Sequence, residues 1–93
     1  MSSNLYVTLY NGYKVPRILF ERVLQRVSFV MDGLEPGIIY LAKGLCGTSF
    51  WFPKSKHERS QAGRCVAHLV VMGELPLKFV TPKGKHPKKY SLI

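Results

Sequence analysis

One amphipathic helix restricts the possible folds of this chain more than any other feature of the sequence. Pro16 suits the first turn of a helix, and the apolar residues that follow it recur at helical spacing. Asp32-Gly33 then interrupts the pattern. We therefore predict a helix from Pro16 to about Met31, with an apolar stripe made by Leu19, Phe20, Val23, Leu24, Val27, Val30 and Met31.

A second helical pattern runs from about Lys56 to Met72. Ser55 and Glu58 have the spacing of a capping box. Gly73 suits the C-terminal cap. The apolar stripe of this helix comprises Ala62, Cys65, Val66, Leu69 and Val70.

The remaining segments are shorter. Residues 5–10 alternate with period two, which predicts a strand, and Asn11-Gly12 predicts a turn. Residues 38–45 are too few for periodicity to separate a helix from a strand, and we favour a short helix. Residues 48–52 are rich in aromatic and hydroxyl side chains and predict an extended connector, closed by Pro53.

The C-terminal segment has the pattern of a basic β-hairpin. Leu77, Phe79 and Val80 predict one strand, and Tyr90 and Leu92 predict the returning strand. Residues 83–87 predict a basic, turn-rich loop between them. The chain has 93 residues, of which 46% are apolar, so it has the length of one domain and can bury a core without metal or disulfide staples.

Positive charge is concentrated in the second half of the sequence. Fourteen Lys and Arg against five Asp and Glu give a formal net charge of +9. Residues 1–53 hold five basic and three acidic side chains, a net of +2, and residues 54–93 hold nine and two, a net of +7. Such a balance argues for an anionic partner and says little about the fold.

The sequence also predicts a compartment. No basic segment followed by a long apolar run opens the chain, and no apolar stretch approaches the roughly 20 residues that a membrane span requires. We expect a cytoplasmic protein in which Cys46 and Cys65 are reduced thiols, because disulfides are rare in that compartment.

Few residues suit catalysis or metal binding. Glu58 and His57 are adjacent helix positions that point in different directions, so they do not form a dyad. A zinc site would have to recruit Cys46, Cys65, His68 and His57, whose spacing lacks the paired ligands of such sites. We expect no enzyme, no metal and no cofactor.

The order of the predicted elements resembles the winged helix-turn-helix family, in particular the small DNA-binding domains of phages and other mobile elements. The local features are residues 60–64, Ser-Gln-Ala-Gly-Arg, on the third helix and Leu75-Pro76-Leu77 at the start of the hairpin. The resemblance covers Pro16 to Ile93. It implies an α+β fold of three helices with a small antiparallel sheet and a C-terminal β-hairpin wing. Residues 1–93 then form a single domain with an N-terminal strand and turn (1–15), a helical core (16–73) and the wing (74–93). The segment 46–54 departs from the family pattern, because it is longer and more aromatic than a tight helix-turn-helix turn.

The resemblance implies that the long helix of the C-terminal half is a recognition helix in the major groove of DNA. At helical spacing His57, Gln61, Arg64 and His68 fall opposite its apolar stripe. Arg and Gln side chains can each form paired hydrogen bonds with a purine base, so Gln61 and Arg64 are the candidates for base reading. A merely solvated helix face is the alternative interpretation.

Basic side chains complete the predicted nucleic-acid interface. Those of the hairpin, which could follow phosphates, are Lys83, Lys85, Lys88 and Lys89. Those near the start of the recognition helix are Lys54, Lys56 and Arg59. For the hairpin, protection of an exposed edge strand is the alternative role.

Trp51 belongs to an aromatic run, residues 50–52, that has more than one interpretation. A lone Trp in so small a domain most often packs in the core. It could also anchor a protein partner or stack on an unpaired base. Tyr6 and Tyr10 similarly suit either packing or a dimer surface.

These observations predict a domain that binds double-stranded DNA as a small transcriptional or mobile-element regulator or as an architectural factor, and that could form a homodimer. Two alternatives remain open. The same positive surface could bind RNA. The scaffold could also bind an acidic protein as an inhibitor or adaptor.

Overall fold

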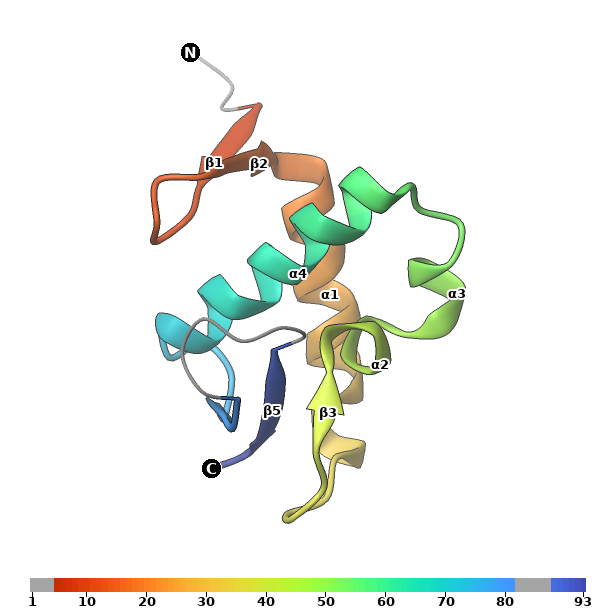
Figure 1. Ribbon diagram of the computed structural model, residues 1–93, viewed down its shortest axis with the longest axis vertical. Coiled ribbons are helices and arrows are strands. Elements are labelled where there is room, and N and C mark those ends of the chain that lie inside the picture. Colours follow the sequence, from red (N-terminus) through yellow and green to blue (C-terminus); the bar gives the residue numbers. More distant parts are fainter. Residues whose placement is uncertain (1–4, 82–87) are drawn as a thin grey trace.

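Two crossing helices form the centre of the molecule (Figure 1). The computed structural model describes residues 5–81 and 88–93. Helix α1 spans Arg17–Val30 and packs on α4, which spans Lys56–Val71. Both stripes predicted from periodicity contribute to the core. Its buried residues from the two helices are Leu19, Val23, Val27, Ala62, Cys65, Val66, Leu69 and Val70.

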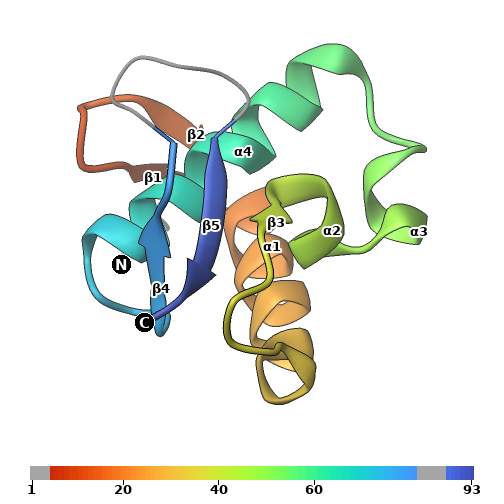
Figure 2. The same cartoon turned by 60° about the horizontal axis from the view of Figure 1, so that its bottom comes forward.

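A three-stranded antiparallel sheet lies beside these helices (Figure 2). Strands β3 (Tyr40–Leu41), β4 (Leu77–Phe79) and β5 (Lys89–Leu92) are arranged in the order β3-β5-β4. Tyr90 is the central residue, because it pairs with Tyr40 on one side and with Phe79 on the other. The predicted C-terminal pairing of strands is therefore confirmed, while residues 82–87 of its loop lie outside the described residues.

The N-terminus forms a second, two-stranded sheet. Strand β1 (Tyr6–Thr8) pairs with β2 (Lys14–Pro16), and Val7 lies opposite Val15. The sequence predicted β1 but missed β2, since three residues directly before a helix are too few to show a period. Gly12 has φ +84° in the connecting turn, a conformation that favours glycine.

Two predictions for residues 38–52 differ from the structure. Residues 40–41 form strand β3 before helix α2 (Ala42–Cys46), so a helix throughout 38–45 was wrong. Pairing with β5 supplies hydrogen bonds that local periodicity cannot reveal. The extended connector at 48–52 was also wrong, because helix α3 (Thr48–Trp51) occupies it. The described residues therefore hold four α-helices in place of the predicted three. A short 3₁₀-helix, Met31–Gly33, follows α1.

The junction of α2 and α3 depends on a glycine. Gly47 has φ +93°, and a Cβ built there would lie 2.7 Å from Nη2 of Arg26. Any other residue would therefore meet both backbone strain and a clash. This close approach lets Arg26 of α1 reach the backbone of the α2–α3 segment.

Both ends of α4 are capped as the sequence predicts. Ser55 Oγ accepts from the Glu58 N–H at 3.2 Å, and Glu58 Oε1 accepts from the Ser55 N–H at 3.1 Å. At the other end Gly73 has φ +74°, and Glu74 N donates to Leu69 O at 2.9 Å. These caps fix the start and the end of the helix that carries the candidate site. No helix in the described part of the chain is long and apolar enough to cross a membrane.

Candidate functional site

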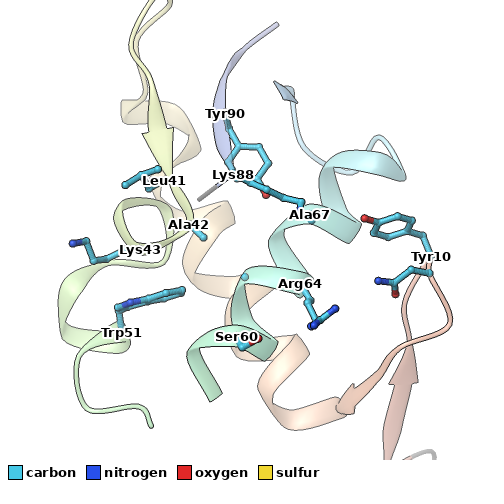
Figure 3. Close-up of a pocket in the computed structure, with 12 residues that line it drawn as sticks. Tyr10, Leu41, Ala42, Lys43, Trp51, Ser60, Arg64, Ala67, Lys88 and Tyr90 are labelled. Carbon is cyan, nitrogen blue, oxygen red and sulfur yellow. The ribbon is translucent and has the colours of Figure 1, made fainter. Parts of the chain in front are cut away.

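A pocket of about 490 Å³ opens along α4, where several separate segments converge (Figure 3). Helix α4 forms one side, and the β1–β2 turn, the β3–α2–α3 segment and β5 form the others. The lining residues are Tyr10, Asn11, Leu41, Ala42, Lys43, Trp51, Ser60, Gly63, Arg64, Ala67, Lys88 and Tyr90. Three of them are basic and none is acidic, so the pocket carries positive charge.

The floor of the pocket is a stripe of α4. Ser60, Gly63, Arg64 and Ala67 are spaced i, i+3, i+4 and i+7, which places them on one face of the helix. Three of the four side chains are small. A Cβ built on Gly63 would meet nothing within 4 Å, so this position leaves open space above the helix backbone.

Arg64, Lys43 and Lys88 supply the positive charge of the pocket. The Arg64 guanidinium lies 4.2 Å from the centre of the Tyr13 ring. Lys43 Nζ lies 5.6 Å from the centre of the Phe52 ring. Contacts of this kind orient a cation without neutralising its charge. The groups therefore remain able to attract an anion.

Trp51 lies on the wall opposite the β1–β2 turn, and Figure 3 shows its ring extending from α3 toward α4. The indole is half-buried, packs against the core and lines the pocket. Arg59 fixes the backbone beneath it, since its Nε donates to Trp51 O at 3.2 Å and its Nη2 to Phe52 O at 2.7 Å. The core interpretation of Trp51 is therefore confirmed in part, and its role in binding a protein partner or an unpaired base stays a prediction.

A second arginine holds the same wall from α1. Arg26 Nε donates to Cys46 O at 3.0 Å, and its Nη2 donates to Ser49 Oγ at 3.1 Å. Arg26 and Arg59 thus fasten α2 and α3 from two different helices. Such charge-assisted hydrogen bonds are stronger than those between neutral groups.

His68 holds Tyr10 on the remaining wall. Tyr10 N–H donates to His68 Nδ1 at 2.8 Å, and the two rings stack with centroids 6.1 Å apart. The Phe20 ring contacts the imidazole edge-on at 5.8 Å. Packing against the N-terminal hairpin therefore engages the imidazole within the protein, and contact of His68 with a ligand stays a prediction.

Tyr90 closes the pocket on the side of β5. The side chain is 1% exposed and packs on Phe79, with ring centroids 5.2 Å apart. Burial raises the pKa of the Tyr90 hydroxyl well above its usual range, and the nearby Tyr10 hydroxyl raises it further. The hydroxyl therefore stays protonated and available as a donor.

The structure brings some of the predicted site residues together and separates others. Arg64, Lys88 and Trp51 all line the pocket. Lys56 and His57 lie exposed in the first turn of α4, outside the pocket lining. Gln61 is half-buried on the same helix.

Two further predicted contacts are engaged within the protein. Arg59 bonds the backbone at Trp51 and Phe52, and Lys54 Nζ lies 4.8 Å from the centre of the Phe50 ring. These interactions make both residues part of the wall that holds Trp51. Direct contact of Arg59 and Lys54 with a nucleic acid stays a prediction.

The structure describes two of the four predicted hairpin lysines. Lys83 and Lys85 lie outside the described residues. Lys88 lines the pocket just before β5, and Lys89 is exposed as the first residue of β5, where its N–H donates to Thr81 Oγ1.

Sequence reasoning missed several pocket residues, chiefly Lys43, Tyr90, Ser60 and Gly63. The helical spacing of Ser60 and Gly63 with Arg64 could have indicated a shared face. Lys43 and Tyr90 gave no such signal, because they lie far apart in sequence and meet α4 only in the folded chain.

The two cysteines belong to the core. Both are free and fully buried, and burial raises the pKa of each thiol to about 12. Both thiols are therefore protonated at neutral pH. Among residues 5–81 and 88–93, no group of three or more His, Cys, Asp and Glu side chains could hold a metal ion.

Comparison with known proteins does not assign this chain to a family. No family model, curated protein or solved structure matches it.

Proposed function

We propose that this chain is a winged-helix domain that binds double-stranded DNA through α4 and the C-terminal strands. Two features of the fold support the proposal. A helix, a short strand, further helices and an antiparallel pair of strands follow one another along the chain. Strand β3, which precedes α2, joins that pair in a single sheet.

The observation that carries the proposal is the separation of charge around α4. Arg64 of α4, Lys43 of α2 and Lys88 before β5 are among the residues that line the pocket, and no acidic side chain lines it. Glu58, the one acidic residue of α4, is engaged in the capping box. A surface of one sign focuses the electrostatic field, and neutralising phosphates releases counterions that favour binding.

The remaining acidic residues lie on other segments. Glu21 pairs with Arg17 within α1 at 3.9 Å. Asp32 and Glu35 follow α1, and Glu74 follows α4. None of these four carboxylates lines the pocket.

The proposal gives the residues distinct roles. Arg64 and Gln61 read base edges from α4, as paired hydrogen bonds to purines allow. Lys56, His57, Lys88 and Lys89 contact phosphates, together with Lys83 and Lys85 of the loop outside the described residues. Arg59, Lys54 and His68 act indirectly, because they hold the pocket walls. The protein then works as a small regulator or architectural factor.

Direct binding measurements test the proposal. Duplex DNA, duplex RNA and single strands of matched sequence are compared at one salt concentration, and preferred duplex sites are then enriched from a random pool. We expect duplex DNA to bind most tightly. Tighter binding of RNA, or no binding of any nucleic acid at about 50 mM salt, would transfer the assignment to an RNA-binding or protein-binding domain.

Arg64→Ala tests base reading separately. Loss of a paired hydrogen bond to a base costs roughly 1–3 kcal/mol of discrimination at one position of the site. Arg22→Ala on α1 is the matched control, because Arg22 is exposed and lies outside the α4 pocket. An unchanged site preference in Arg64→Ala would show that Arg64 does not read bases.

A further inference from the structure

We propose that the pocket beside α4 binds one nucleotide, with an unpaired base against Trp51 and its phosphate at the cations of α4 and β5. If that nucleotide belongs to a bound DNA strand, the inference rests on the proposed function. A free mononucleotide would present the same chemistry. The pocket volume of about 490 Å³ lies within the roughly 300–1,000 Å³ typical of small-molecule sites.

The hydroxyl of Tyr90 is the observation that points most directly to a ligand. Tyr90 is 1% exposed, yet its hydroxyl has no hydrogen-bond partner among residues 5–81 and 88–93. In that part of the chain every fully inaccessible polar side-chain atom has a partner. The Tyr90 hydroxyl is therefore reached from the pocket that it lines, and a ligand acceptor there would satisfy it.

The walls of the pocket suit a flat aromatic ring. Figure 3 shows Trp51 and Tyr10 on opposite sides of α4, and the small residues Gly63 and Ala67 of that helix also line the pocket. Aromatic side chains bind unpaired bases by stacking, without selecting a particular sequence. The absence of a side chain on Gly63 keeps the space open in which a ring can lie.

The charges of the pocket suit a phosphate. Arg64, Lys43 and Lys88 line the same space, and no acidic residue does. Inorganic phosphate alone would leave the indole of Trp51 without a partner. An uncharged aromatic compound would supply no anion for the positive charges of the pocket. A phosphorylated base uses both sets of groups.

Fluorescence of Trp51 provides a direct readout, because it is the single tryptophan of the chain. The full-length protein is titrated with deoxyadenosine monophosphate, with deoxyadenosine and with inorganic phosphate. We expect saturable quenching by the nucleotide at concentrations at least tenfold lower than by the nucleoside. Phosphate alone should leave the indole emission unchanged. Absence of saturable quenching by the nucleotide overturns the proposal.

A pair of glycine substitutions locates the binding event. Gly63→Leu fills the floor of the pocket and should weaken nucleotide binding at least tenfold. Gly44→Leu adds the same side chain to α2 outside the pocket, where a Cβ also meets nothing within 4 Å, and should leave binding unchanged. Circular dichroism checks that both variants fold. Full quenching in folded Gly63→Leu protein contradicts the proposal.

Tyr90→Phe separates binding from folding. Removing a hydroxyl that lacks a partner among residues 5–81 and 88–93 should leave stability unchanged or raise it. Losing the hydrogen bond to the ligand should weaken nucleotide binding roughly fivefold. Nucleotide affinity equal to that of the parent protein would show that the hydroxyl does not contact the ligand.

Two duplexes identify the source of the nucleotide. One is perfectly paired, and the other carries a single unpaired adenine. Tighter binding of the second, lost in Gly63→Leu, assigns the pocket to an extruded DNA base. Equal binding of both duplexes, with quenching by the mononucleotide, assigns it to a free nucleotide. Failure of the paired duplex to bind contradicts the proposed function alone, because the mononucleotide titration does not depend on it.

Discussion

The outward face of α1 and the pocket face of α4 are both open to solvent but differ in what surrounds them. A hollow of about 550 Å³ on α1 is lined by residues of that helix only, namely Ile18, Glu21, Arg22, Leu24 and Gln25. The α4 pocket is lined by residues from several segments far apart in sequence. An exposed helix face thus becomes a candidate site where other elements add walls and charge of one sign.

The two helices also begin differently. Helix α1 follows Pro16, which makes no side-chain capping bond. Helix α4 begins with a complete capping box between Ser55 and Glu58. The N-terminal turn of α4 is therefore held by its own side chains, whereas that of α1 depends on the adjacent β-hairpin, where Arg17 N donates to Leu5 O at 2.8 Å.

Charge reversal on each face should give the largest difference. Replacing Lys43, Arg64 and Lys88 with Glu should weaken binding to duplex DNA about 100-fold or more, because the positive pocket face becomes negative and repels the phosphates. Reversal of Arg17 and Arg22 on α1 is the control and should change affinity far less. Fluorescence anisotropy measures both. Equal losses in the two variants would mean that net charge, and not the α4 pocket, governs binding.

Arg26→Ala tests the fastening of the pocket wall from α1. The change removes the hydrogen bonds to Cys46 O and Ser49 Oγ and leaves a half-buried carbonyl without its donor. The free energy of unfolding should fall by about 2 kcal/mol. Arg22→Ala, on the exposed side of the same helix, should change it by less than about 0.5 kcal/mol. Urea denaturation compares the two, and similar midpoints would contradict a special role for Arg26.

Ser55→Ala tests whether the capping box stabilises the start of α4 in a way that α1 lacks. Loss of the side-chain cap of α4 should lower the free energy of unfolding by about 1 kcal/mol. Ser28→Ala on the exposed side of α1 is a matched hydroxyl deletion and should have little effect. Thermal unfolding followed by circular dichroism provides the measurement. A Ser55→Ala protein as stable as the parent would show that the capping box contributes nothing in solution.

The smallest expected effect is a pH dependence at the same cap. Hydrogen bonds from Ser55 hold the pKa of the Glu58 carboxyl below its usual 4.5. The ionised carboxylate therefore stabilises the fold above pH 4.5, and this contribution is lost as the pH falls through the lower value of the folded state. Glu58→Gln should make the free energy of unfolding less dependent on pH in that acidic range. Identical slopes in the parent and Glu58→Gln would contradict the assignment.

The sequence predicted the two long helices because their apolar residues keep one period over many positions. Ser55, Glu58 and Gly73 also marked the ends of α4 through local chemistry. Strand β2 and helix α3 were missed or misassigned because they span three and four residues, too short for a period to appear.

The site was less predictable than the fold. Arg64 was selected from helical spacing and residue type, Lys88 from charge and Trp51 from residue type, and all three line the pocket. His68 was selected from helical spacing, but the contact that engages it comes from Tyr10 of the N-terminal hairpin. Lys43 and Tyr90 join the pocket through the β3–β5 pairing, which the sequence did not predict.

The salt dependence of duplex DNA binding tests the central claim most directly. About six phosphate contacts predict that log affinity falls against log salt with a slope near −5. Replacing the phosphate-contacting residues Lys56, Lys88 and Lys89 with Gln should reduce the steepness of that slope by about 3. A slope near −1 for the parent protein, or an equally steep slope in the triple variant, would contradict a nucleic-acid interface at α4.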